Sequence, residues 1–287
     1  MRSEASGGGT ASGGGLVCAL ALALITLLPT AAHAGRCHRA GVALRAPIGL
    51  NLDPADFGAA MSPCVQSVFA LGVRGALGIG SPAFYGIIGG EGTVTVGVVP
   101  ADNWQITASW TAVQFSFVQN VSVVVAQPSI GAMTLAVQRV AFHTDRWQLT
   151  PYVRGLLPTA SNWHFAVPWG VEGGVSLLWA PDPRVSLFAH VALPVSNVSI
   201  DQRRQLTFTP RIGVDAAFFL SNWLEPSIGI EARFTTDTDG ALQYIAPRAA
   251  LRVHFGGGVT LQLAGMLPLA GIERTNARVA LTFGSAW

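Results

Sequence analysis

The sequence is poor in charged residues and contains no lysine. Only 11% of its 287 residues are charged, and the 17 residues counted as lysine or arginine are all arginine. An ordinary soluble domain carries about 25% charged residues, so the composition argues against a typical soluble protein. The net charge of +2 is small and scattered along the chain. We therefore expect no nucleic-acid partner.

Long apolar runs are also missing, although half of the residues are hydrophobic. After residue 28 no run approaches the roughly 18 apolar residues that a transmembrane helix needs. High apolarity without long runs is typical of a membrane β-barrel. Its lipid-facing residues alternate along each strand with residues that face the lumen.

The sequence lacks the common motifs of catalysis and cofactor binding. There is no phosphate loop, no CxxC pair and no HExxH motif. The histidines are scattered, and only His164 lies in a long polar connection, beside Ser161. The acidic stretch Asp237–Gly240 lacks the rest of a calcium loop and is better explained as a turn. We expect no enzyme, no metal and no cofactor.

The first 34 residues have the features of a cleaved secretory signal. Leu16–Leu28 is an apolar core too short to span a bilayer, and Ala32-His33-Ala34 is an A-x-A cleavage site before Gly35. The positive start is weak, because it contains only Arg2. We predict residues 1–34 to be a signal peptide and the rest of the chain to be exported.

The chain contains few cysteines, and whether their thiols can form a disulfide depends on export to an oxidising compartment. Cleavage would remove Cys18 and leave Cys37 and Cys64 in an oxidising compartment. This pair predicts a disulfide, with two free thiols as the alternative. Both cysteines lie in residues 35–66, which show little alternation. We predict this segment to be a periplasmic N-terminal extension that could reach into the lumen as a plug.

Alternating hydrophobicity begins near Val68 and continues to the C-terminus. The clearest example is Trp104–Trp110, where apolar and polar residues strictly alternate. Short turns recur near residues 102, 145, 182, 222 and 257, and longer polar connections such as Gly80–Gly92 and Ser196–Gln205 lie between other strands. Aromatic residues flank these turns and would form one interfacial girdle: Trp104, Trp147, Trp179, Trp223 and Phe255, together with the terminal Trp287.

The last stretch, Asn276–Trp287, reads NARVALTFGSAW, with Val279, Leu281, Phe283 and Trp287 on one face. This ending resembles the final strand of bacterial outer-membrane β-barrels. The resemblance implies that the strand closes the barrel and is read by the barrel assembly machinery. Together with the hairpin repeat it predicts an all-β, up-and-down antiparallel transmembrane barrel of about 12 strands, within a range of 10–14, over residues 67–287.

The inward positions of these strands carry most of the charge. An arginine on the lipid side would cost about 2–4 kcal/mol at the bilayer midplane, so the charged parity must face the lumen. This gives seven arginines and three carboxylates, either as the wall of an anion-favouring pore or as pairs that fill a narrow barrel. The predicted lumen residues are Arg74, Arg154, Glu172, Arg211, Asp215, Glu231, Arg233, Arg248, Arg252 and Arg278.

The resemblance implies a place in the outer membrane of a Gram-negative bacterium, in contact with outer-membrane lipids. Our leading prediction is a passive channel for small solutes. The alternative is a non-conducting structural or surface-interaction barrel with a charge-paired, plugged lumen. Length and strand count are also similar to those of the twelve-stranded uptake barrels of the meta-pathway phenol-degradation family, although no motif carries this second resemblance.

Overall fold

The structure is a computed structural model that describes residues 61–78, 87–120, 123–159, 169–200, 203–235, 242–271 and 276–286. The chain divides into two compact units, Met1–Ala32 and His33–Trp287, and every described residue belongs to the second. The predicted signal peptide, residues 1–34, and most of the predicted extension, residues 35–66, lie outside the described residues and stay predictions. The described residues contain no helix long and apolar enough to cross a membrane.

Fifteen β-strands make up the described part of the chain. They are β1 Val68–Gly78, β2 Ile87–Ala101, β3 Trp104–Asn120, β4 Val123–Ser129, β5 Met133–Arg139, β6 Phe142–His143, β7 Trp147–Leu157, β8 Trp169–Asp182, β9 Val185–Ile200, β10 Arg203–Phe208, β11 Arg211–Phe218, β12 Leu224–Phe234, β13 Leu242–Gly256, β14 Val259–Met266 and β15 Asn276–Ala286.

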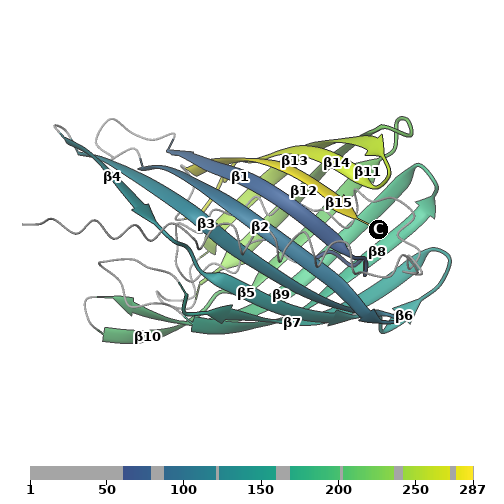
Figure 1. Cartoon of the computed structure of the whole chain (residues 1–287), viewed down its shortest axis with the longest axis horizontal. Helices are drawn as coiled ribbons and strands as arrows, with labels where there is room; N and C mark the ends of the chain where they lie inside the picture. The colour runs from purple at the N-terminus through teal and green to yellow at the C-terminus, as the bar shows by residue number, and fades with distance from the viewer. Residues whose placement is uncertain are drawn as a thin grey trace, which may run out of the picture. The chain divides into compact units, whose positions relative to one another are not determined.

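Twelve of these strands form a closed antiparallel ring (Figure 1). Its order is β1, β2, β3, β5, β7, β8, β9, β11, β12, β13, β14 and β15, and β15 pairs back onto β1. The three short strands extend the ring beyond the ends of β5 and β11. Strands β4 and β6 lie beyond the two ends of β5, where they pair with β3 and β7, and β10 precedes β11 and pairs with β9. The predicted twelve-stranded up-and-down barrel is therefore confirmed. Closure leaves no unpaired edge, which a sheet within a membrane requires.

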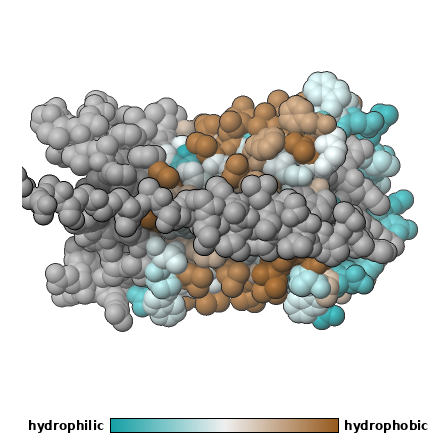
Figure 2. Space-filling view, viewed as in Figure 1, coloured by the Kyte–Doolittle hydropathy of each residue, from teal (hydrophilic) through white to brown (hydrophobic). Residues whose placement is uncertain are grey.

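The two faces of the ring differ as the alternation predicts. On β1, Val73 is 64% exposed whereas its neighbour Arg74 is 4% exposed. Figure 2 shows the outward apolar residues gathered in a belt, with hydrophilic residues beyond it at the end where the short turns lie. Large outward residues of this belt are Leu71, Val96, Ile106, Val137, Val153, Val171, Val191, Leu193, Ile212, Val214, Ile228, Ile230, Leu251, Leu263, Val279, Leu281 and Phe283.

The five predicted short turns all connect neighbouring strands. They join β2 to β3, β6 to β7, β8 to β9, β11 to β12 and β13 to β14. In the turn between β13 and β14, Gly256, Gly257 and Gly258 all have positive φ. A Cβ at Gly258 would lie 2.1 Å from the carbonyl oxygen of Ala286. Glycine is therefore required there both for the backbone conformation and for the close approach of the C-terminal strand.

Two predicted loops are partly wrong. Residues 87–92 of the predicted Gly80–Gly92 loop belong to β2, and most of the predicted Ser196–Gln205 connection belongs to β9 and β10. Both stretches lose alternation because they lie in the long halves of their hairpins, away from the short turns. There the strand pairing continues although the residues do not alternate clearly in hydropathy, so the sequence does not reveal the strands.

Three prolines lie within strands of the ring without ending them. Pro151, Pro226 and Pro247 lie within β7, β12 and β13, and each still has a cross-strand neighbour. Pro210 lies in the break between β10 and β11. A proline removes only one ladder donor, and the rest of a closed ring holds the strand in place.

Candidate functional site

The candidate site is the polar interior of the ring. The ten residues predicted to line the lumen all have inward parity, and all are buried or nearly so. Their part in solute selectivity stays a prediction. The predicted ratio of seven arginines to three carboxylates is wrong, because Glu91 and Glu225 also lie buried against inward arginines. Inward arginines therefore outnumber inward carboxylates by two, seven to five, among the described residues.

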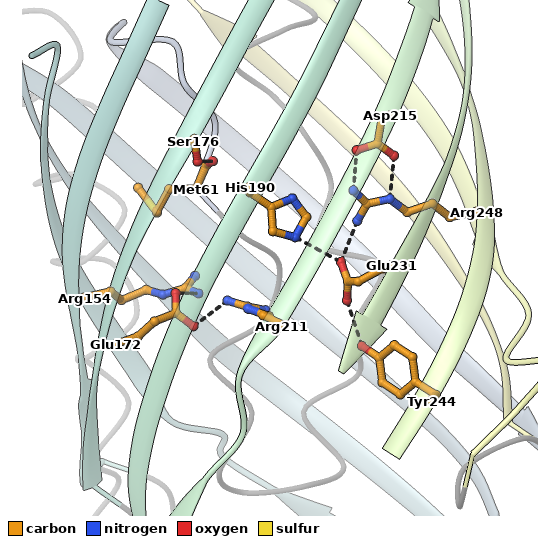
Figure 3. A network of polar contacts seen from close by, with 10 residues as sticks. All are labelled: Met61, Arg154, Glu172, Ser176, His190, Arg211, Asp215, Glu231, Tyr244 and Arg248. Carbon is orange, nitrogen blue, oxygen red and sulfur yellow. Dashed lines mark hydrogen bonds and ion pairs between the residues drawn. The ribbon is translucent and has the colours of Figure 1, made fainter. Parts of the chain in front are cut away.

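One group of charges centres on Glu172 in β8 (Figure 3). Arg154 in β7 donates to its Oε1 and Arg211 in β11 to its Oε2, each at 2.5 Å. Glu172 is 0% exposed, so the carboxylate is removed from water and neutralised from both sides. The three side chains span β7 to β11, and they tie together four neighbouring strands of the wall. Charge-assisted bonds of this kind are the stronger class of hydrogen bond.

A second group centres on Arg248 in β13. Its guanidinium donates to both carboxylate oxygens of Asp215, with Nε 2.5 Å from Oδ1, and its Nη1 lies 2.7 Å from Glu231 Oε2. The hydroxyl of Tyr244 donates to Glu231 Oε1 at 2.7 Å. His190 Nε2 lies 3.5 Å from Glu231 Oε2. Figure 3 shows these side chains converging from β9, β11, β12 and β13.

Glycine makes the second group sterically possible. In register, Gly229 lies between Asp215 and Arg248, so Asp215 reaches its partner across an intervening strand. A Cβ at Gly229 would lie 2.1 Å from Asp215 Oδ1. Gly213 has the same place between His190 and Glu231, and a Cβ there would lie 2.4 Å from His190 Cε1. Because glycine has no side chain, Asp215 and His190 can extend across Gly229 and Gly213 toward their partners on the strand beyond.

Further charged pairs extend around the ring. Arg74 pairs with Glu91 between β1 and β2. Near the short turns, Arg252 pairs with Glu225, and its Nε donates to the side-chain oxygen of Gln262 at 2.9 Å. His254 Nε2 lies 3.0 Å from the same Glu225.

Two arginines complete the set of predicted lumen residues. The guanidinium of Arg278 lies 5.4 Å from the centre of the Tyr244 ring, which is within cation–π range. Arg233 is buried directly beside Arg211 in the register of β11 and β12.

The segment Met61–Ser67, which precedes β1, is bound to the inner wall. Four of its backbone carbonyls accept hydrogen bonds from inward side chains of β3, β5, β7 and β8. Ser176 donates to Met61 at 2.6 Å, Gln148 and Thr150 to Pro63 at 2.5 and 2.7 Å, Gln138 to Cys64 at 3.0 Å, and Gln105 to Gln66 at 2.6 Å. Because the donors come from four neighbouring strands, the segment is held along the wall rather than at one point.

Cys64 adds an apolar and a covalent anchor to this segment. It packs with Leu178, Phe188, Ala217 and Phe219, and it is disulfide-bonded. Cys37, its predicted partner, lies outside the described residues, so the Cys37–Cys64 pairing stays a prediction. Among the described residues no group of three or more His, Cys, Asp or Glu is placed to hold a metal ion.

Comparison with known proteins rests on structure alone. No protein-family model matches the chain, and no curated protein matches it. The fold is similar to the COG4313 outer membrane channel from Pseudomonas putida F1, with a TM-score of 0.59 and 12% identity over 82% of this chain and 100% of that one. It is also similar to the β domain of the Bordetella autotransporter BrkA, with a TM-score of 0.53 and 10% identity over 78% of this chain and 100% of that one.

The chain has the fold of bacterial outer-membrane β-barrels. The aromatic residues of this barrel fit that setting. Trp104, Trp147, Trp223 and Phe255 are exposed beside the short turns, and Trp147 stacks on Trp179 with ring centres 5.2 Å apart. Indole rings favour the headgroup level of a membrane, so they mark where the apolar belt ends. The sixth predicted member of the girdle, Trp287, lies outside the described residues.

Sequence reasoning missed several residues of the barrel interior. His190 and His254 carry no functional signal in the sequence, where the histidines are scattered, yet each lies beside a carboxylate. Glu225 shares the parity of Glu231, so strict extension of the alternation along β12 finds it. Glu91 had no such signal, because its glycine-rich surroundings suggested a loop.

Proposed function

We propose that this barrel is a channel of the Gram-negative outer membrane for small solutes, with a preference for anions. The observation that carries the proposal is the interior of the ring, which is lined by arginines in excess over carboxylates. Charged rings on a pore wall favour ions of opposite sign. An apolar interior would serve equally well to fill a purely structural barrel, so a charged one favours solute passage.

Two of the predicted segments fit an outer-membrane protein and form part of the proposal. Residues 1–34 act as a cleaved signal for export, and the C-terminal strand β15 is recognised by the barrel assembly machinery. The outward apolar belt contacts outer-membrane lipids. The solute class stays open between anionic or polar solutes and the aromatic compounds suggested by the phenol-degradation resemblance.

The segment before β1 acts in this proposal as a plug. Support comes from the five side chains that donate to the carbonyls of Met61–Gln66, and from the burial of Cys64 among apolar residues. Because these donors are hydroxyl and amide groups, water can replace the segment when it leaves. The barrel would then alternate between a closed and an open lumen.

A non-conducting barrel is the second candidate. The observation in its favour is that the inward charges are largely paired and have little exposed surface. A barrel that never opens would keep these pairs permanently, and its loops or outer surface would carry its function. Conductance separates the two candidates.

The proposal is tested by single-channel recording of the refolded protein across a KCl gradient, beside an Arg248→Ser variant. We expect an anion preference that reverses or disappears in the variant, because Asp215 and Glu231 lose their shared cation. Arg184→Gln, which changes an exposed turn arginine, serves as the matched control and should leave selectivity unchanged. An ion preference that Arg248→Ser does not alter would contradict this location of the selective wall.

A further inference from the structure

Among the arginines of the described strands whose side chains are placed, Arg139 alone has outward parity. It lies at the end of β5 with outward parity, following Leu135 and Val137 of the lipid-facing belt, and it is exposed. The cost of an outward arginine is large at the bilayer midplane and falls close to zero at the interface. Its position near the short turns places Arg139 at that interface.

The guanidinium of Arg139 is oriented but not neutralised. It lies over the ring of Trp104, 5.2 Å from the ring centre, and the two residues are directly paired between β3 and β5. Within the described part of the chain Arg139 makes no ion pair, whereas the inward arginines Arg154 and Arg248 each contact carboxylates. Stacking leaves the edge of the guanidinium free to donate hydrogen bonds.

The surroundings of Arg139 are unusually aromatic. Phe142 follows it in the exposed strand β6, and the stacked pair Trp147–Trp179 lies on the next two strands of the ring. A second exposed arginine, Arg146, lies in the turn before Trp147. On the opposite half of the girdle, Trp223 and Phe255 have no described arginine on their outward faces. This side of the barrel therefore combines aromatic rings with two exposed arginines, alongside the exposed turn carboxylates of Asp102 and Asp145.

The end of the barrel that carries Arg139 identifies the leaflet. Short turns of outer-membrane barrels lie on the periplasmic side, and both β1 and β15 begin or end there. The adjoining inner leaflet consists of phospholipids, whose phosphate groups lie at the level of the aromatic girdle. A guanidinium binds phosphate through two parallel N–H donors, a geometry that a compact ammonium cannot match.

We propose that Arg139 and Trp104, flanked by Phe142 and Trp147, form a binding site for the headgroup phosphate of an anionic phospholipid in the inner leaflet. Trp104 holds the guanidinium over its ring, and the N–H donors of the guanidinium face the phosphate. The neighbouring aromatic side chains cover the glycerol and the first part of the acyl chains. An anionic lipid is favoured over a zwitterionic one because no amine of the lipid competes for its phosphate.

The test is native mass spectrometry of the folded, full-length mature protein released from detergent micelles with phosphatidylglycerol or phosphatidylcholine. We expect retained phosphatidylglycerol to exceed phosphatidylcholine in the unmodified protein. Arg139→Gln should weaken phosphatidylglycerol retention about fivefold, the factor expected for one surface arginine. Arg139→Lys should fall between the two, because it keeps the charge and loses the paired donors.

Two further variants separate a built site from general attraction. Arg184→Gln removes an exposed arginine from another short turn and should leave lipid retention unchanged. Trp104→Leu keeps the apolar bulk but removes the stacking partner, so it should reproduce much of the Arg139→Gln effect. Equal losses in Arg139→Gln and Arg184→Gln, or no loss in Arg139→Gln, would overturn the proposal. Heat-modifiable migration on a gel confirms that each variant is folded.

Discussion

Replacing Glu172 with glutamine is expected to lower the free energy of unfolding of the barrel by about 3–5 kcal/mol, the cost of breaking a buried ion pair. Arg154 and Arg211 both bind this carboxylate at 2.5 Å, and the amide would remove the negative charge that the two buried cations share. Urea-induced unfolding in lipid vesicles, followed by tryptophan fluorescence, measures the change.

The matched control is Asp102→Asn, which neutralises an exposed carboxylate in a short turn. Surface substitutions away from special features change stability by less than about 0.5 kcal/mol, so this variant should unfold like the unmodified barrel. If Glu172→Gln also stayed within that range, the Arg154–Glu172–Arg211 group would contribute little to stability, and the lumen would be wetter than its burial indicates.

The second large effect is expected on gating. Gln148 and Thr150 both donate to the carbonyl oxygen of Pro63, so the double variant Gln148→Leu/Thr150→Val removes two of the bonds that hold the proposed plug. Two buried hydrogen bonds contribute roughly 1–3 kcal/mol, which would shift the balance of closed and open lumen about 5–150-fold. Single-channel recording should show a correspondingly larger fraction of time in the open state.

Thr282→Val is the control for this double variant. Thr282 is a buried inward residue of β15 that has no described contact with Met61–Ser67. It should therefore leave the open fraction unchanged. An open fraction that rises equally in both variants would mean that any loss of luminal polarity alters conduction. The hydrogen bonds to Pro63 would then have no specific role in keeping the lumen closed.

The architecture could be predicted from the sequence because a membrane requires apolar side chains at every second position of each strand that crosses it. Each strand crossing the lipid must alternate, so Leu71 and Val73 opposite Arg74 reveal both a strand and its facing. Short turns flanked by tryptophan reveal the hairpins. Alternation gives no strand signal in residues 87–92 and 196–200, although the structure places them in β2 and β9.

The contacts inside the lumen could not be predicted, because parity fixes a direction but not a partner. Which inward residues meet depends on the register between strands. Asp215 meets Arg248 only because Gly229 lies between them in register. No pattern within a single strand predicts that these three residues align across three strands. The contacts of Met61–Ser67 are harder still, since this segment has no alternation and binds through its backbone carbonyls. Its sequence therefore carries no complementary pattern.

The most direct test of the account compares two refolded proteins in planar bilayers, the mature chain from Gly35 onward and a chain that lacks residues 35–66. We expect brief or small openings for the chain that begins at Gly35 and steady, larger, anion-favouring conductance for the truncated one, because the hydrogen bonds and apolar contacts of the proposed plug are gone. A truncated protein that is folded by heat-modifiable migration yet silent in the bilayer would contradict the account and favour a non-conducting barrel.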